Sequence, residues 1–280
     1  RYPDVLVMTA TPIPRTLALA CYGDLDVSVI DELPPGRKSV ITRWTSEDKR
    51  RWVYQFVSSR IREGRQVYFV YPLIEESEEI DLKAAQDMAE RLKNIFSQFE
   101  VELLHGKMKR EEKELIMRRF YQGRINIMVC TTVIEVGIDV PNATVMVIEN
   151  AERFGIAQLH QLRGRVGRAG LQSYCFLLTG KRISEEAVKR MKVMCRTNDG
   201  FQIAEEDLKL RGPGEFFGTR QWGMLDLKIA NLLRDQKILN LARREAFNLV
   251  RESPLLNNYP LLIKAIKRRF PYQWELSKVG

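Results

Sequence analysis

Residues 158–168 of this 280-residue chain read QLHQLRGRVGR and come near the end of a long alternation of strand and helix patterns. Three arginines fall within six residues, at positions 163, 165 and 168, with glycines at 164 and 167 between them. Arginine has a permanent charge and a rigid fork of N–H donors that matches phosphate oxygens, and glycine lets the backbone approach a ligand closely. The pattern favours a phosphate-binding segment, and a solvated basic helix start is the alternative.

Apolar patterns on both sides of this segment, from residue 39 to residue 179, indicate the fold. Short apolar runs predict strands at residues 40–44, 67–71, 101–104, 125–130, 145–148 and 174–178. Apolar residues three or four apart predict helices between them, including one whose inner face carries Leu115, Ile116 and Phe120. Such alternation is typical of an α/β fold, and we expect a RecA-like parallel sheet with helices on both faces. Its ligands should bind at the carboxyl ends of the strands.

In two further stretches an apolar run leads into threonines. They are residues 8–15, MTATPIPR, and residues 127–141, IMVCTTVIEVGIDVP. Together with residues 158–168 they resemble the third, fifth and sixth motifs of superfamily 2 helicases. Residues 31–37, DELPPGR, and residues 210–221, LRGPGEFFGTRQ, look more specifically like the RecG family of ATP-dependent branched-DNA helicases. This resemblance extends from about residue 5 to about residue 234.

The resemblance implies a nucleotide site. Arg165 and Arg168 match the arginine-finger positions of the sixth motif, and Gly137 and Asp139 match fifth-motif positions that approach the ribose and phosphates of ATP. An arginine inserted from outside the phosphate loop can accelerate phosphoryl transfer by about 10³- to 10⁵-fold. Asp139 could instead be a turn residue before Val140 and Pro141, and we expect Arg163 to support either the nucleotide or the DNA site.

The resemblance also implies coupling and DNA contacts. The residues expected to relay nucleotide state to the DNA groove are Thr9, Thr11, Gln158 and His160. Those expected to contact the DNA backbone or to form the translocation loop are Thr131, Thr132, Arg211, Arg220 and Gln221. Thr9 and Thr11 could simply cap the following helix. His105 is more often a turn residue than a functional one at such a strand end.

We expect three regions. Residues 1–36 would end a preceding RecA-like helicase domain and its linker, because Pro34, Pro35 and Gly36 break regular structure. Residues 37–180 would form a second RecA-like helicase domain, with motifs four to six. Residues 181–280 would hold a translocation hairpin, whose first helix is capped by Ser184, then a glycine-rich loop and further helices at 225–250 and 260–269.

The composition of the chain indicates which classes of partner it binds. The net charge of +9 favours a polyanion, and no apolar run approaches the roughly 18 residues that cross a bilayer. We therefore expect DNA and no membrane. The four cysteines, at 21, 130, 175 and 195, are too scattered for zinc, so no metal site is expected. A reducing bacterial cytoplasm, at the nucleoid, is the expected location.

A Gly-x-x-x-x-Gly-Lys-Ser/Thr phosphate loop is absent from the sequence, and the chain begins at Arg1. We therefore expect ATP with Mg²⁺ to be held mainly by a preceding helicase domain of the same polypeptide, and this chain alone to be inactive. The family also places a wedge in an N-terminal domain. The role of residues 251–280 is left open.

The function expected is the C-terminal motor half of an ATP-dependent DNA helicase. It would bind the duplex arms of branched junctions and remodel stalled replication forks and Holliday junctions in recombination and repair. Two alternatives stay open. One is a translocase like the transcription-repair coupling factor, and the other is a nucleic-acid-binding RecA-like module that hydrolyses nothing.

Overall fold

The computed structural model describes residues 6, 8, 28, 30, 32, 34–72, 78–131, 139–211 and 235–269. These residues belong to two compact units, of which one contains the sheet and the helices up to residue 211 and the other contains two later helices. Most of the stretch at residues 8–15 and the whole glycine-rich loop lie outside the described residues.

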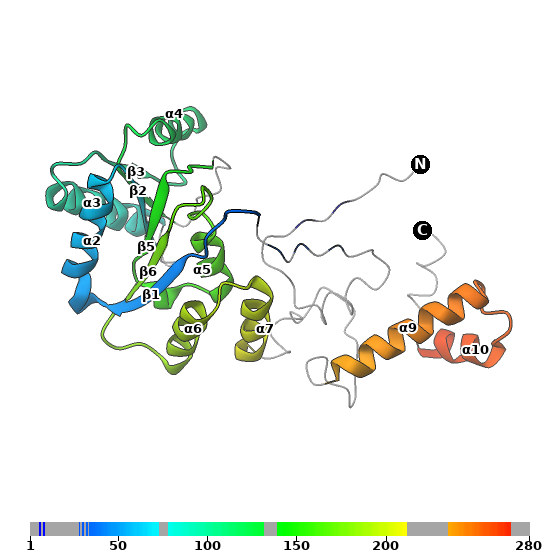
Figure 1. Cartoon of the computed structure of the whole chain (residues 1–280). Helices are drawn as coiled ribbons and strands as arrows, with labels where there is room; N and C mark the ends of the chain where they lie inside the picture. The colour runs from blue at the N-terminus through cyan, green and yellow to red at the C-terminus, as the bar shows by residue number, and fades with distance from the viewer. Residues whose placement is uncertain are drawn as a thin grey trace. The chain divides into compact units, whose positions relative to one another are not determined.

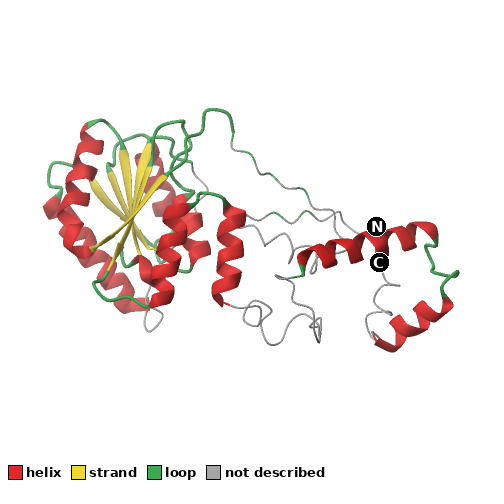
Figure 2. Ribbon diagram, turned by 60° about the horizontal axis from the view of Figure 1, so that its bottom comes forward, coloured by secondary structure: helices red, strands yellow, loops and turns green. Residues whose placement is uncertain are grey.

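Within the described residues, the first unit contains a six-stranded sheet in which every neighbouring pair is parallel (Figures 1 and 2). Its order is β1-β6-β5-β2-β4-β3. The strands are β1 (Ile41–Ser46), β2 (Gln66–Tyr71), β3 (Val101–Leu104), β4 (Ile127–Thr131), β5 (Ala143–Ile148) and β6 (Tyr174–Thr179). All residues of β2, β4 and β5 are buried, as expected of a parallel sheet covered on both faces. The predicted α/β, RecA-like fold is confirmed.

Helices cover both faces of the sheet (Figure 2). They are α2 (Arg50–Arg62), α3 (Glu78–Ile95), α4 (Arg110–Tyr121), α5 (Ile156–Arg163), α6 (Glu185–Arg196) and α7 (Gly200–Arg211). Side chains of β2 alternate between the two hydrophobic clusters, with Tyr68 and Val70 in one and Val67 and Phe69 in the other. The first cluster takes side chains from α4, α5 and α6, and the second from α2 and α3. Period-two alternation thus gives the sheet its two cores.

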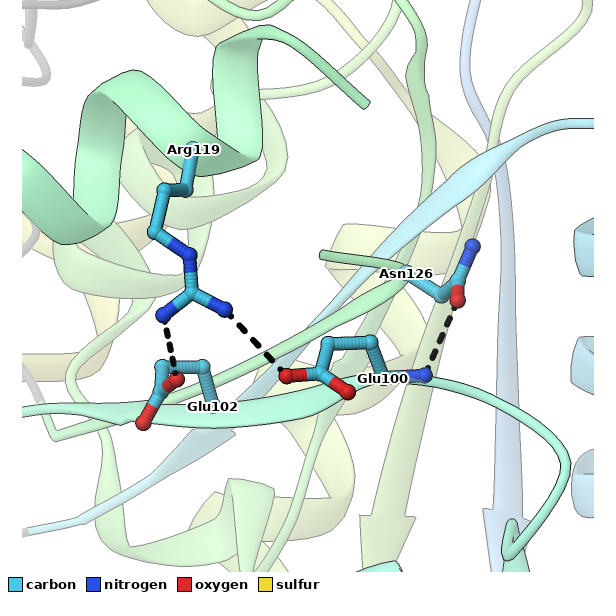
Figure 3. A network of polar contacts seen from close by, with 4 residues as sticks. All are labelled: Glu100, Glu102, Arg119 and Asn126. Carbon is cyan, nitrogen blue, oxygen red and sulfur yellow. Dashed lines mark hydrogen bonds and ion pairs between the residues drawn. The ribbon is translucent and has the colours of Figure 1, made fainter. Parts of the chain in front are cut away.

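Helix α4 corrects one detail of the prediction. Ile116 and Phe120 face the core as expected, but Leu115 is 59% exposed, and Met117 is buried instead. Arg119 of α4 donates to Glu100 and Glu102 at 3.2 and 3.1 Å, which ties the helix to the edge strand β3 (Figure 3). With this attachment, the inward stripe contains residues 116, 117 and 120, which leaves position 115 beside it.

The hairpin predicted after residue 183 is present as α6 and α7. Ser184 caps α6, because its Oγ accepts a hydrogen bond from the Ala187 amide at 3.2 Å. In the second unit, α9 (Gln236–Glu252) and α10 (Pro260–Arg269) are helical, and the predicted bounds of the latter are confirmed. None of the described helices is long and apolar enough to span a membrane.

Candidate functional site

The segment that follows α5 is the centre of the candidate site, and we call residues 164–168 the arginine loop. Helix α5 is fixed in the core by Ile156, Leu159 and Leu162. Its first turn is capped by Gln158, whose Oε1 accepts a hydrogen bond from the Gly155 amide at 3.0 Å. The helix ends at Arg163, so the arginine loop leaves from a rigid base.

Arg163 has a structural role, and its expected support of the nucleotide or DNA site stays a prediction. It is 2% exposed, and its Nη1 donates to the carbonyl oxygens of Met194 and Thr197, both at 2.9 Å. It also donates to Thr42 Oγ1 at 3.3 Å. A helix leaves carbonyls without partners at its C-terminus, and Arg163 satisfies those of α6. This arginine therefore joins α5 to the α6–α7 hairpin.

Arg165 and Arg168 differ from Arg163 because both reach toward solvent. Arg165 is half-buried, and its guanidinium forms no hydrogen bond or ion pair with any other described residue. Arg168 Nε donates to the Gly164 carbonyl at 3.2 Å, and its Nη1 lies 3.5 Å from Asp139 Oδ1. Both guanidiniums lie near Tyr68, where they oppose the rise in its phenol pKa that burial causes.

A pocket of about 520 Å³ adjoins the arginine loop. Its lining consists of Pro34, Pro35, Gly36, Arg37, Asp139, Arg168, Ala169 and Gly170. The structure therefore brings together two of the predicted site residues, Asp139 and Arg168, with the linker residues. The volume falls within the range of about 300–1,000 Å³ that is usual for small-molecule sites.

His160 lies on α5, one turn before the arginine loop. Burial, together with the nearby Arg163 charge, lowers the pKa of its imidazole to about 4, so the ring is neutral at physiological pH. A neutral ring fits hydrogen bonding better than proton donation. No hydrogen bond of the imidazole exists within the described part of the chain, and coupling through His160 stays a prediction.

Some of the other predicted residues are described by the structure, and the rest lie outside the described residues. Thr131 ends β4 and is 2% exposed. The backbone carbonyl oxygen of His105 accepts a hydrogen bond from the Met108 amide at 3.3 Å, which fits the expected turn residue. Those outside the described residues are Thr9, Thr11, Thr132, Gly137, Arg220 and Gln221. Arg211 ends α7, but its side chain also lies outside them.

One contact in this region was not predicted from the sequence. Arg37 Nε donates to the Gly167 carbonyl at 3.1 Å, although 130 residues separate the two positions. The sequence indicated a linker at residues 33–36 and nothing about what it touches. The only local signal was the Pro-Pro-Gly run itself, which marks a turn.

Comparison with known families agrees with this geometry. Residues 48–170 match the family model "Helicase conserved C-terminal domain", and residues 197–268 match "ATP-dependent DNA helicase RecG, domain 3, C-terminal". In this chain, the parallel RecA-like sheet and the arginine loop after α5 are therefore parts of the C-terminal helicase domain of a superfamily 2 helicase.

Similarity to individual proteins identifies the family within this class of helicases. The chain is 53% identical over 284 aligned positions to the ATP-dependent DNA helicase RecG of Aquifex aeolicus, covering all of this chain and 36% of that protein. Identity to RecG of Thermotoga maritima is 56% over 243 positions, covering 86% of this chain and 31% of the relative. A solved structure, RecG bound to a three-way DNA junction, matches with a TM-score of 0.67 at 54% identity, over 84% of this chain and 30% of the other. The chain belongs to the RecG family of ATP-dependent DNA helicases, and it spans about a third of the length of these relatives.

Proposed function

We propose that this chain is the C-terminal motor half of an ATP-driven translocase that remodels branched DNA, such as stalled forks and four-way junctions, in recombination and repair. Arg165 and Arg168 would complete an ATP site whose phosphate loop belongs to a preceding RecA-like domain. Support comes from relatives named ATP-dependent DNA helicase RecG and from the related structure of RecG bound to a three-way DNA junction. This role would place the protein in the bacterial cytoplasm, at the nucleoid.

The observation that carries the proposal is the Arg165 guanidinium, which forms no hydrogen bond or ion pair with another residue that the structure describes. A half-buried charge with no partner among the described residues is costly unless a ligand or another domain supplies an anion. In phosphoryl transfer, negative charge spreads over the oxygens of the transferred phosphoryl group, and a positioned arginine stabilises it. Arg168 would act beside Arg165, and Asp139 and Gly137 would approach the ribose and phosphates.

Magnesium would be held elsewhere. In the described ranges, no group of three or more His, Cys, Asp or Glu side chains could hold a metal ion. Bound together with ATP, Mg²⁺ would neutralise the negative charge that develops on the phosphates. We assign it to the domain that carries the phosphate loop. Residues of this chain would supply only the arginines and the contacts to the rest of the nucleotide.

DNA would be the second ligand, through its backbone. The net charge of +9 favours a polyanion, and hydroxyl, amide and guanidinium groups position a duplex without reading its sequence. We assign backbone contacts to Thr132, Arg211, Arg220 and Gln221, whereas Thr131 is 2% exposed and would contact DNA only after its surroundings move. We assign coupling to Thr9, Thr11, Gln158 and His160. Arg163 supports a route between the two sites, since it binds α6 directly and is next to the arginine loop.

The test is Arg165→Ala in the complete helicase that contains this sequence. We expect DNA-stimulated ATP turnover to fall by about 10³-fold, because a transition-state charge loses its partner, while DNA affinity and melting temperature stay near wild type. Arg62→Ala, at the exposed end of α2, is the matched control and should change none of the three. Equal loss of turnover, DNA binding and stability would instead mean that Arg165 is structural. Wild-type turnover in Arg165→Ala would mean that Arg165 is not an arginine finger, and absence of turnover in the unsubstituted helicase would favour the non-hydrolysing alternative.

A further inference from the structure

We propose that Arg37 is a positioning residue for Arg168, and that the turn at residues 34–37 holds the arginine loop in place. This inference rests on the proposed function, because it explains how one of the two fingers is set. We call residues 34–37 the linker turn. It follows the predicted end of the preceding domain, and it lines the same pocket as Arg168 and Asp139.

The linker turn has a rigid backbone. The Arg37 amide donates to the Pro34 carbonyl at 3.1 Å, and Gly36 has a φ of +81°. Proline at the second position and glycine with positive φ at the third are the requirements of a type II turn. Because the proline ring also fixes its own φ, the Arg37 side chain leaves from a backbone with little freedom.

That side chain binds the residue immediately before Arg168. Arg37 Nε donates to the carbonyl oxygen of Gly167 at 3.1 Å. Gly167 has a φ of +83°, and a Cβ there would lie 2.9 Å from Val40 Cγ2, so only glycine fits without movement. The peptide that leads into Arg168 is therefore held between the Arg37 guanidinium and the buried Val40.

Further contacts join the two chain segments on either side. Gly170 has a φ of +68°, and a Cβ at this position would lie 3.0 Å from the Gly36 carbonyl oxygen. Gln172 Nε2 donates to the Ser39 carbonyl at 3.0 Å, and the Ile41 amide donates to Ser173 at 2.9 Å, where β1 begins to pair with β6. Residues 36–41 and residues 167–173 are thus in contact along their whole length.

The consequence is that Arg168 is positioned from two directions. Its side chain is oriented by the Gly164 carbonyl and by Asp139, and its backbone is fixed through Gly167 by Arg37. A catalytic group displaced by about 1 Å can lose up to about 10²-fold in rate. Removing Arg37 should therefore weaken catalysis although Arg37 itself need not touch the nucleotide.

The experiment compares Arg37→Ala, Arg37→Lys, Arg168→Ala and the double variant Arg37→Ala/Arg168→Ala in the complete helicase. We expect Arg37→Ala to lower kcat for ATP about tenfold with KM changed less, and Arg37→Lys, which keeps a charged hydrogen-bond donor, to recover part of the loss. The double variant should be no slower than Arg168→Ala alone, because Arg37 acts through Arg168. Hydrogen exchange should become faster in residues 164–173 of Arg37→Ala and stay unchanged in β4.

The outcomes separate the two proposals. A severe defect in Arg168→Ala together with wild-type turnover and exchange in Arg37→Ala would overturn the positioning role and leave the finger assignment intact. Losses that multiply in the double variant would also overturn it, because they would mean independent action. If Arg168→Ala turns over ATP normally, Arg168 is not a finger, and the positioning role fails with it. Arg62→Ala again serves as the control with unchanged kcat.

Discussion

Arg168 Nη1 lies 3.5 Å from Asp139 Oδ1, on the border of a pocket that both residues line. Their side chains are 34% and 49% exposed, so solvent screens this ion pair. Exposed ion pairs contribute about 0.2–1 kcal/mol to stability, and this one can be exchanged for a phosphate at little cost. The ion pair therefore orients the Arg168 side chain but is weak enough to be replaced by a contact with a phosphate.

Asp139→Asn should consequently change ATP binding more than folding. We expect the melting temperature of the variant to stay within about 2 °C of wild type, because the substitution removes only a weak, solvent-screened ion pair with Arg168. If Asp139 contacts the nucleotide, KM for ATP in the complete helicase should rise by roughly tenfold, as one hydrogen bond to a charged group disappears. Steady-state kinetics and calorimetry check the two values. A large drop in melting temperature with an unchanged KM would support the plain turn role.

Arg163→Met should destabilise the first unit strongly. The substitution removes three hydrogen bonds from a residue that is 2% exposed and leaves the Met194 and Thr197 carbonyls without their donor. We expect the free energy of unfolding to fall by about 3 kcal/mol, measured by urea unfolding of this chain. Arg168→Met, at a partly exposed position, is the comparison and should cost less than about 1 kcal/mol. Equal effects of the two substitutions would contradict the structural assignment of Arg163.

His160 should make stability depend on pH. Its folded-state pKa of about 4 lies below the ordinary value of 6.5, so between these values the unfolded chain binds a proton that the folded chain does not. The contribution is fully present above pH 6.5 and is lost as pH falls toward 4. His160→Gln should therefore lose less stability than wild type between about pH 7.5 and about pH 5, in urea unfolding. An identical loss in both proteins would mean that the imidazole is not desolvated.

Ser184→Ala should remove the N-cap of α6. Loss of the hydrogen bond to the Ala187 amide is expected to cost about 1 kcal/mol, whereas Ser184→Gly should cost only a few tenths. For a unit of this size, 1 kcal/mol corresponds to a melting temperature lower by about 2–4 °C. Thermal unfolding of wild type, Ser184→Gly and Ser184→Ala checks whether the melting temperature falls in that order. A Gly variant less stable than the Ala variant would argue against capping.

Much of this fold was readable from local pattern. The alternation of apolar runs and helical spacing predicted six strands and their helices, because burial on both faces forces strands to be apolar throughout. The cap at Ser184 and the bounds of α10 were also predictable, since capping and helix breaking depend on neighbours in the chain. Leu115 was not, because its exposure depends on how α4 is rotated against the sheet.

The sequence by itself determined the α/β alternation and the three arginines of residues 158–168, because both follow from residue types and their spacing. Only the tertiary structure decided which of these arginines is buried and which are accessible to solvent. Arg163 falls on the buried face of α5 with Ile156 and Leu159, whereas Arg165 and Arg168 follow the end of the helix. Only the fold, too, could bring Arg37 to Gly167. That contact exists because β1 pairs with β6, and a pairing between strands more than a hundred residues apart leaves no trace in local pattern.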